Sequence, residues 1–373
     1  MKIVILHAYS ATNSGDGLLV DEAIALCRAA HIDPDIVVLA LDPESFSLPG
    51  IDVIHPFTGL PTTPSSVRVL SGALASWLRG ARLPRSTRAV VESADLVVGV
   101  GGGYLRGGNP AELLKMLLAH APQLPTSSYP RTVYLPQSVG PLRFGSAAIL
   151  RGRIARVGQL DLRDGRSMRE LAAIGNTTRI TDSALLGIAG GLDESARVAS
   201  GTAGIGLVAR ALHASGARRD GYEASLQLIH QTDGAIPLVQ ASARGNDDAA
   251  FYKALGWQGE FPTLRVATSK DSPGRPGAVI SVRLHGAIQS IRNGVPAVHL
   301  SYERKGWGAY EDLGLPEFVH NAFDFDPDLV IRQAESLRDD SSSYWAAVDR
   351  ALPQLSMSRN QVVAQLRGGM RTK

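Results

Sequence analysis

Short apolar runs rich in β-branched residues alternate with stretches of helical spacing along nearly the whole chain. The clearest unit has a strand-like run at residues 278–284 and helical spacing at 286–292, and its helix should stop at Asn293-Gly294. Such units build parallel sheets covered by helices, because a parallel neighbour is reached only through a crossover. The alternation therefore predicts an α/β fold.

The predicted elements fall into two groups separated by a segment rich in Gly, Ala and Ser at 187–201, which we interpret as a linker. Further strands are expected at 2–6, 35–41, 52–56, from 94 into a glycine cluster, and at 131–135, 159–162, 179–181, 204–209, 235–240, 263–267 and 297–302. Further helices are expected at 18–30, from 110, at 147–157, 167–173, 221–232, up to 255, up to 313, and at 329–337 and 344–366. We expect two Rossmann-like domains, 1–190 and 191–373, that face each other across a cleft.

Composition excludes several classes of protein. The formal net charge is only +3, and no dense basic tract is interleaved with aromatic residues, so we expect no nucleic-acid binding. Cys27 is the only cysteine and lies on the apolar side of a predicted helix, which indicates a core residue and fits a reducing compartment. The apolar run at the N-terminus is too short for a signal peptide, and no stretch approaches the length of a membrane span. We expect a cytoplasmic protein.

Residues 67–88 form a basic amphipathic stretch. Leu70, Leu74, Trp77 and Leu78 share one side, and five arginines lie elsewhere in it. Such a piece could rest on an anionic membrane surface, or it could be an ordinary solvated helix. The sequence leaves both interpretations open.

Charged side chains stand where predicted strands end and helices begin. Arg283 and His285 are two residues apart, so on an extended chain they point to the same side, while Leu284 points into the core. Arg163 occupies the same kind of position after the strand predicted at 159–162. A fixed cation, a titratable imidazole and a helix N-terminus at one sheet edge suit an anionic substrate that exchanges a proton. The alternative is an arginine paired with a carboxylate and a histidine that caps the helix.

Three further segments follow predicted strands. Asn13 and Asp16 precede the first helix, as caps or as part of a substrate cleft. Gly101, Gly102 and Gly103 let a backbone approach a ligand closely, but they match neither the dinucleotide fingerprint nor a P-loop. Residues 136–141 contain Gln137 between two prolines and predict a rigid turn at a strand end.

Taken together, these segments resemble the polysaccharide pyruvyltransferase family. The motifs that carry the resemblance are Asn-x-Gly-Asp at 13–16, the glycines at 101–103, Gln-x-x-Gly-Pro at 137–141, Arg-Asp-x-x-Ser at 163–167, Asp182, Arg-x-His at 283–285, Tyr-x-x-Lys at 302–305 and Leu-Gly-Leu at 313–315. Pro136 and Ser138 depart from the glycines that many members have there. Each motif is weak alone, whereas their order and spacing are specific.

The resemblance implies an architecture like that of GT-B glycosyltransferases and transfer of a pyruvyl group from phosphoenolpyruvate to two hydroxyls of one sugar, forming a cyclic ketal. It places Arg163, Arg283, Leu284 and His285 at the donor.

The chemistry of the residues agrees with that implication. Phosphoenolpyruvate carries two acidic groups, which suits two forked guanidinium groups. His285 is the expected general acid, because an unperturbed imidazole titrates near neutrality. Lys305 would neutralise the leaving phosphate, and Asp16 would orient or deprotonate the acceptor hydroxyl. Asn13, Gly101–Gly103 and Gln137 would line the acceptor side.

No cofactor and no metal are expected, since no Asp, His or Cys group has metal-ligand spacing. The expected partners are phosphoenolpyruvate and a glycan acceptor. The sequence leaves open which sugar that is, whether it is lipid-linked, and whether the protein contacts the inner face of a membrane. Two other functions also stay open: a glycosyltransferase of the same shape that uses a sugar nucleotide, and a carbohydrate-binding scaffold without catalysis.

Overall fold

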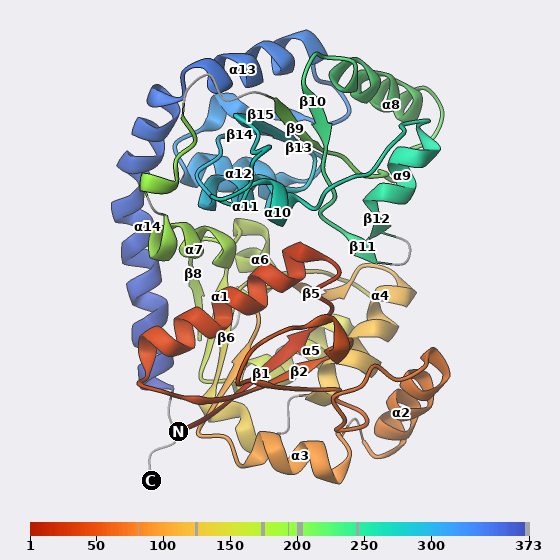
Figure 1. Ribbon diagram of the computed structural model, residues 1–373. Helices are drawn as coiled ribbons and strands as arrows, with labels where there is room; N and C mark the ends of the chain where they lie inside the picture. The colour runs from red at the N-terminus through yellow and green to blue at the C-terminus, as the bar shows by residue number, and fades with distance from the viewer. Residues whose placement is uncertain are drawn as a thin grey trace. The chain divides into compact units, whose positions relative to one another are not determined.

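The computed structural model describes residues 1–80, 82–123, 126–172, 176–192, 194–199, 204–243 and 246–369. Contacts divide the chain into two compact units, and each unit is built on its own parallel sheet (Figure 1). Unit 1 consists of Met1–Ala11, Asp16–Ser183 and Ser358–Lys373, and unit 2 of Thr12–Gly15 and Ala184–Met357. The predicted α/β class with two Rossmann-like domains is confirmed.

Unit 1 contains an eight-stranded sheet. Its strands are β1 (Lys2–Ala8), β2 (Asp35–Ala40), β3 (Asp52–Ile54), β4 (Leu96–Gly99), β5 (Gly102–Gly107), β6 (Thr132–Leu142), β7 (Gln159–Leu162) and β8 (Thr177–Arg179). Their order is β3-β2-β1-β4-β6-β7-β8, with β5 also paired to β6, and every pair is parallel. The chain runs outward from β1 on one side and from β4 on the other. The strand order therefore reverses between β1 and β4, where open α/β sheets usually bind ligands.

Helices cover this sheet because its strands are apolar on both faces. Ile3, Val4 and Ile5 of β1 are fully buried, as is Cys27 of the first helix, so the prediction of a core cysteine is confirmed. The helices of this part of the chain are α1 (Ser14–Ala30), α2 (Ser66–Leu78), α3 (Arg85–Glu92), α4 (Pro110–Lys115), α5 (Ser146–Ile154) and α6 (Gly165–Glu170).

Unit 2 contains a five-stranded parallel sheet. Its strands are β9 (Ile205–Val208), β10 (Ala235–Pro237), β13 (Ala278–Ser281), β14 (Ala297–Ser301) and β15 (Val319–Asn321), in the order β10-β9-β13-β14-β15. The strand order reverses between β9 and β13. A short antiparallel pair, β11 (Ser242–Ala243) and β12 (Asn246–Asp247), lies apart from this sheet. The helices are α7 (Ser183–Gly191), α8 (Ala217–His230), α9 (Asp248–Ala254), α10 (Leu264–Ala267), α11 (Leu284–Arg292), α12 (Arg304–Asp312), α13 (Pro327–Asp339) and α14 (Ser342–Gly368).

Three local predictions are wrong for identifiable reasons. The strand predicted at 263–267 is helix α10, because the Thr263 hydroxyl caps it by accepting a hydrogen bond from the Val266 N–H. The turn predicted at 136–141 is part of β6, which continues through both prolines with an irregular register against β5 and β7. The glycine cluster hides a strand, β5, because glycine has low β propensity.

The basic stretch at 67–88 is two helices rather than one. Helix α2 ends at Leu78, and Pro84 is the N-cap of α3, where its fixed backbone geometry suits a helix start. Part of the expected linker at 187–201 is also helical, because α7 extends to Gly191. Residues 193, 200 and 201 of that linker lie outside the described residues, as does residue 173, the predicted end of a helix.

The units are not continuous halves of the chain. Compared with the expected ranges 1–190 and 191–373, residues 12–15 and 184–190 group with unit 2, and the chain end from Ser358 groups with unit 1. Within unit 1, the Gln365 amide donates to the Asp161 carboxylate at 3.1 Å, and the Arg367 guanidinium donates to the Ala30 carbonyl at 3.1 Å. The last turns of α14 therefore form part of the packing of unit 1.

No helix within the described ranges combines the length and the apolar character needed to cross a bilayer.

The burial of Asp161 in this packing can be tested through the pH dependence of stability. Burial raises the pKa of its carboxyl from 3.8 to about 7, and hydrogen bonds from Gln159 and Gln365 oppose that rise. Because the folded state disfavours the ionised form, the free energy of unfolding should fall as pH rises from about 4 to about 7. Asp161→Asn should remove this loss and stabilise the protein at pH 8 by up to about 4 kcal/mol, with little effect at pH 4.

Denaturant unfolding at the two pH values measures the effect. Asp35→Asn, at the exposed start of β2, is the control and should change neither value. A destabilised Asp161→Asn variant at pH 8 would contradict the interpretation.

Candidate functional site

Arg283 lies where β13 passes into α11. The strand ends at Ser281, and Arg283 is the N-cap residue of the helix, with extended backbone geometry. The prediction of a strand through residue 284 is therefore wrong, because the helix begins at Leu284. His285 is consequently helical and does not share one extended segment with Arg283. Leu284 is buried, as expected.

The buried guanidinium of Arg283 is held by a buried carboxylate. Its Nε lies 3.0 Å from both carboxylate oxygens of Asp248, its Nη2 also bonds to Asp248, and Nη2 donates to the Asn246 amide oxygen at 2.9 Å. Nη1 donates to none of the described residues. The alternative of an arginine paired with a carboxylate is therefore the observed state.

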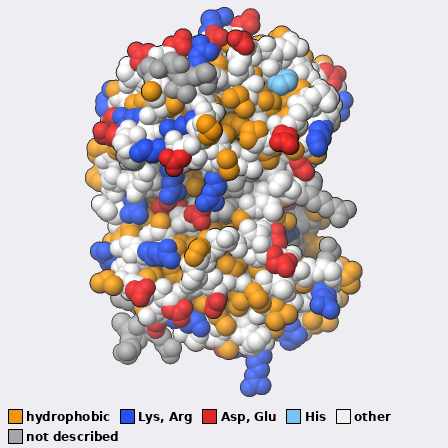
Figure 2. Space-filling view, in the orientation of Figure 1, with side chains coloured by type: hydrophobic (Ala, Val, Ile, Leu, Met, Phe, Trp, Pro, Cys, Tyr) orange, Lys and Arg blue, Asp and Glu red, His pale blue; other side chains and the backbone are white. Residues whose placement is uncertain are grey.

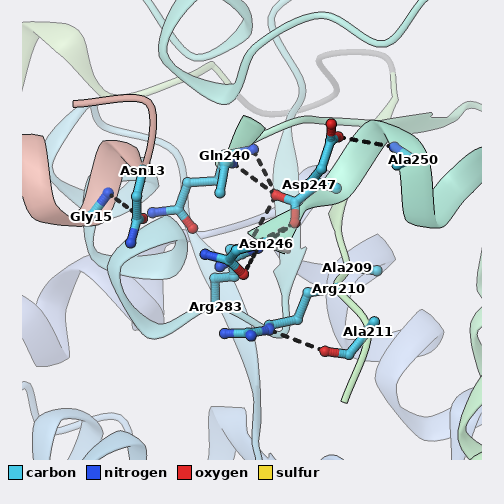
Figure 3. A network of polar contacts seen from close by, with 12 residues as sticks. Asn13, Gly15, Ala209, Arg210, Ala211, Gln240, Asn246, Asp247, Ala250 and Arg283 are labelled. Carbon is cyan, nitrogen blue, oxygen red and sulfur yellow. Dashed lines mark hydrogen bonds and ion pairs between the residues drawn. The ribbon is translucent and has the colours of Figure 1, made fainter. Parts of the chain in front are cut away.

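Asp248 also fixes the backbone around it. Its Oδ2 accepts hydrogen bonds from the N–H groups of Gln240 and Ala241, at 3.0 and 2.9 Å (Figure 3). Burial raises the pKa of Asp248, and Arg283 together with these two N–H groups opposes that rise. Asp247, the neighbouring residue, has the simpler role of N-cap to α9.

The same backbone holds the segment Thr12–Gly15. The Ser14 N–H donates to the Gln240 carbonyl at 3.1 Å, the Ser242 N–H donates to the Thr12 carbonyl at 2.9 Å, and Asn13 forms an isolated bridge with Ala241. The Asn13 side chain accepts a hydrogen bond from the Gly15 N–H at 3.2 Å. Asn13 therefore caps the start of α1, which is one of the two roles that the sequence left open for it.

Gly15 lies directly against the imidazole of His285. A Cβ added at Gly15 would be only 2.6 Å from the His285 Nδ1, so the imidazole occupies the space that a side chain would need. His285 is half-buried in the first turn of α11. The Asn-x-Gly motif thus packs against the Arg-Leu-His motif within unit 2.

A second histidine, His299, lies in β14 and is buried. Its Nδ1 bonds to the Ser281 carbonyl at 2.8 Å, so this nitrogen carries the proton. Burial, together with the nearby Lys305 and His285, lowers the pKa of His299 to about 4, although the hydrogen bond to Ser281 acts in the opposite direction. His299 is therefore neutral at physiological pH. Lys305 lies in the first turn of α12, with its ammonium 3.1 Å from the Glu303 carboxylate.

In unit 1, Arg163 follows β7 and repeats the arrangement of Arg283. Its Nη1 lies 2.5 Å from the Asp182 carboxylate, and its Nε donates to the Ser138 hydroxyl at 2.8 Å. Ser138 in turn donates to Asp164 at 2.6 Å. Ser138, which departs from the family pattern, therefore connects Arg163 to the N-cap of α6.

The remaining predicted residues belong to unit 1. Gly102 and Gly103 start β5, and a Cβ on Gly101 would lie 2.5 Å from the Ser183 hydroxyl and 2.9 Å from the Pro136 carbonyl. Gln137 is fully buried in β6. Asp16 lies in the first turn of α1.

Sequence reasoning missed four contributors. Asp248, Asn246, Gln240 and Arg210 were not among the predicted site residues. Arg210 follows β9, so its place after a predicted strand was a usable signal. The pairing of Asp248 with Arg283 had none, because 35 residues separate them. Among the described residues, no cluster of three or more His, Cys, Asp or Glu could hold a metal ion.

A family model described as polysaccharide pyruvyl transferase matches residues 13–304, which is most of the chain and includes both arginine sites. The chain belongs to this family. Amylovoran biosynthesis protein AmsJ of Erwinia amylovora is 32% identical over 87 residues, covering 23% of this chain and 21% of that relative. The match thus spans about a fifth of the length of the curated relative.

Solved structures show the fold of this family member. A structure described as trehalose-6-phosphate from E. coli bound with UDP-2-fluoro glucose aligns with 98% of this chain and 99% of its own, at 11% identity and a TM-score of 0.52. UDP-GlcNAc 2-epimerase from Methanocaldococcus jannaschii aligns over 91% and 93%, at 11% identity and a TM-score of 0.46. The likeness to the former supports the predicted GT-B-like class of two Rossmann-like domains.

Gly15→Ala tests the contact with His285. The added Cβ must displace the imidazole, and a misplacement of about 1 Å can lower an enzyme rate by about 10²-fold. Gly17→Ala is the matched control in the same helix, because its Cβ would meet Ala11 at an ordinary 3.5 Å. Both changes favour helix, so folding should be retained.

Histidine ring signals in NMR, assigned with His285→Gln, and transferase activity measure the effect. The His285 signals should shift in Gly15→Ala and stay in place in Gly17→Ala. Equal spectra for both variants would count against the contact.

Proposed function

We propose that this family member transfers the pyruvyl group of phosphoenolpyruvate to two hydroxyls of one sugar, forming a cyclic ketal and releasing phosphate. The observation that carries the proposal is the junction between β13 and α11. There the fixed guanidinium of Arg283 and the imidazole of His285 both lie at the N-terminus of a helix. That corner belongs to the segment matched by the family model.

The paired arginines suit the donor. Asp248 and Asp182 fix the guanidinium groups of Arg283 and Arg163, so little rotamer freedom is lost when a ligand binds. On Arg283 the Nη1 group is left to donate to a ligand. The N-terminus of α11 offers further N–H groups to an anion, and Leu284 anchors that turn in the core.

The reaction can be written with every proton placed. Protonation of the methylene carbon makes it a methyl group and leaves an oxocarbenium-like centre, to which the first sugar hydroxyl adds. The C–O bond to phosphate then breaks, and the second hydroxyl adds to the same carbon. Of the two protons released by the hydroxyls, one replaces the proton consumed at the methylene carbon and the other leaves with phosphate.

His285 is the proton donor in this proposal. Histidine is the side chain type that most often transfers protons in enzymes, and positioned proton transfer typically contributes about 10²–10⁴-fold to a rate. His299 is a poor candidate because its pKa of about 4 keeps it neutral. We further propose that Lys305 neutralises the leaving phosphate and that Asp16 orients or deprotonates the acceptor hydroxyl.

The acceptor side is proposed for the strand ends of unit 1. Gly101–Gly103 and Gln137 lie at or next to β5 and β6, beside the reversal of strand order between β1 and β4. Asn13, the remaining residue proposed for the acceptor, belongs to unit 2. The polysaccharide named in the family description is the proposed acceptor class.

The proposal is tested by incubating the protein with phosphoenolpyruvate and a panel of glycans. Mass spectrometry should find a product heavier by one pyruvate less one water, with matching phosphate release. His285→Gln should lower the rate by about 10²–10⁴-fold while the melting temperature is unchanged. His320→Gln, a half-buried histidine of β15, is the control and should keep the activity.

Isothermal titration with UDP- and GDP-sugars covers the alternative glycosyltransferase function. Binding of a sugar nucleotide without any response to phosphoenolpyruvate would sink the proposal. Full biological activity of His285→Gln would favour a scaffold without catalysis.

We also propose that the protein works at a membrane surface, with helix α2 as the contact. Five apolar side chains of α2 are more than half exposed: Val67 77%, Leu70 63%, Leu74 51%, Trp77 55% and Leu78 72%. Ala73 and Ser76 form its buried side. The predicted apolar side of this stretch therefore faces solvent, as the hydrophobic and basic atoms around α2 illustrate (Figure 2).

Charge supports an anionic lipid surface as the partner. Between Asp52 and Glu92 the sequence has no acidic residue, while Arg68, Arg79, Arg82, Arg85 and Arg88 all lie there. An exposed apolar stripe bordered by arginines is typical of helices that lie in the interface of a membrane. A lipid-linked acceptor would be presented at such a surface.

Flotation with liposomes tests this surface. Binding to vesicles containing phosphatidylglycerol should be strong at low salt and should weaken at 0.5 M salt and in Arg68→Glu/Arg79→Glu. Arg265→Glu, exposed in α10, is the control and should bind like the wild type. Dimerisation that Leu74→Glu abolishes, without any vesicle binding, would show that α2 joins two copies instead.

A further inference from the structure

Two arginines stand at equivalent positions on neighbouring strands of unit 2. In the parallel register of β9 and β13, Val208 pairs with Ser281. Two residues beyond each lie Arg210 and Arg283. The order of the sheet reverses between these two strands, so both arginines flank the switch point of unit 2. Ligands of open α/β sheets bind at this point, outside the carboxyl ends of the strands.

Arg210 is held in place by neutral groups. Its Nη1 donates to the Tyr302 hydroxyl at 3.0 Å. Its Nε donates to the Ala211 carbonyl at 3.3 Å (Figure 3). Tyr302 directly follows β14, the next strand beyond β13, so three neighbouring strand ends contribute to this arrangement. The side chain of Arg210 is half-buried.

Arg210 and Arg283 also act on one shared neighbour. The phenol of Tyr222 donates to the Arg210 carbonyl at 2.8 Å, and the charges of Arg210, Arg283 and Asp248 all influence its pKa, which burial raises most. The two guanidinium groups therefore lie in the same electrostatic environment.

Charge balance distinguishes Arg210 from the other cations of this edge. Arg283 is paired with Asp248, and Lys305 is paired with Glu303. Arg210 contacts no carboxylate among the described residues: its guanidinium donates to the Tyr302 hydroxyl and to the Ala211 carbonyl. Of Arg210, Arg283 and Lys305, Arg210 is therefore the half-buried cation that the described residues leave without a carboxylate partner. An anion would supply the missing partner.

We propose that Arg210 binds one acidic group of the phosphoenolpyruvate donor, its carboxylate or its phosphate, beside Arg283. This inference rests on the proposed function. Tyr302 is the positioning residue that holds the guanidinium fork toward the ligand through its hydroxyl. Arg283, neutralised by Asp248, supplies directed N–H groups, while Arg210 supplies net charge.

The test is titration calorimetry of phosphoenolpyruvate against the wild type, Arg210→Ala, Arg210→Lys and Tyr302→Phe. Arg210→Ala should raise the Kd about 10- to 100-fold, and Arg210→Lys should recover part of the loss because the charge is kept but the fork is not. Tyr302→Phe should raise the Kd by a smaller factor. Thermal unfolding of each variant checks that folding is retained.

The matched control is Arg218→Ala. Arg218 is an exposed arginine of the same unit that stacks on Phe323, at 3.9 Å from the ring centroid, and its removal should leave the Kd within about twofold. If Arg210→Ala binds phosphoenolpyruvate as tightly as the wild type, the inference is wrong and the proposed function stands.

Competition with two smaller ligands shows whether Arg210 binds the phosphate or the carboxylate of phosphoenolpyruvate. Inorganic phosphate and pyruvate are each used to compete against phosphoenolpyruvate in the wild type and in Arg210→Ala. Competition by phosphate that is lost in the variant identifies the phosphate subsite, and loss of competition by pyruvate identifies the carboxylate subsite. A wild type that binds none of the three ligands overturns both the inference and the proposed function.

Discussion

The arrangement of unit 2 depends on one buried carboxylate. The Asp248 carboxylate accepts hydrogen bonds from the Arg283 guanidinium. It also accepts hydrogen bonds from the backbone N–H groups of Gln240 and Ala241. That backbone in turn pairs with residues 12–15, which brings Gly15 against His285. Removing one partner of a buried ion pair costs about 3–5 kcal/mol, because the other charge is left without compensation. A single interaction thus fixes both the guanidinium and the backbone beside the imidazole.

The same solution occurs in unit 1, where Asp182 and Ser138 hold Arg163 after β7. In both units an arginine at a strand end is oriented by a buried acid before any ligand arrives. Such pairing weakens the net attraction for an anion, since the positive charge is already balanced. The pairing instead fixes the direction in which each guanidinium group donates its remaining hydrogen bonds. In our proposal, Arg210, which contacts no carboxylate among the described residues, supplies the net charge that attracts the anionic donor to unit 2.

Local sequence patterns predicted the secondary structure correctly where the conformation of a strand or helix depends mainly on its own residues. The apolar runs identified most strands of both sheets, and the breaks after them located Arg163 and Arg283. They misjudged 263–267, where a threonine cap outweighs β-branched composition, and β5, where glycine conceals a strand. They also assigned the apolar side of 67–88 without revealing that it faces solvent, because exposure depends on which side of α2 packs against the rest of unit 1.

The sequence by itself determined the α/β class, the family motifs and the strand-end positions of the charged residues, because these follow from short-range periodicity and spacing. Only the tertiary structure decided the partners of those residues. Asp248 meets Arg283 from 35 positions away, Gly15 meets His285 across most of the chain, and Arg210 comes level with Arg283 only through the register of β9 and β13. Such contacts arise from the order in which strands assemble into a sheet, and no local pattern records that order.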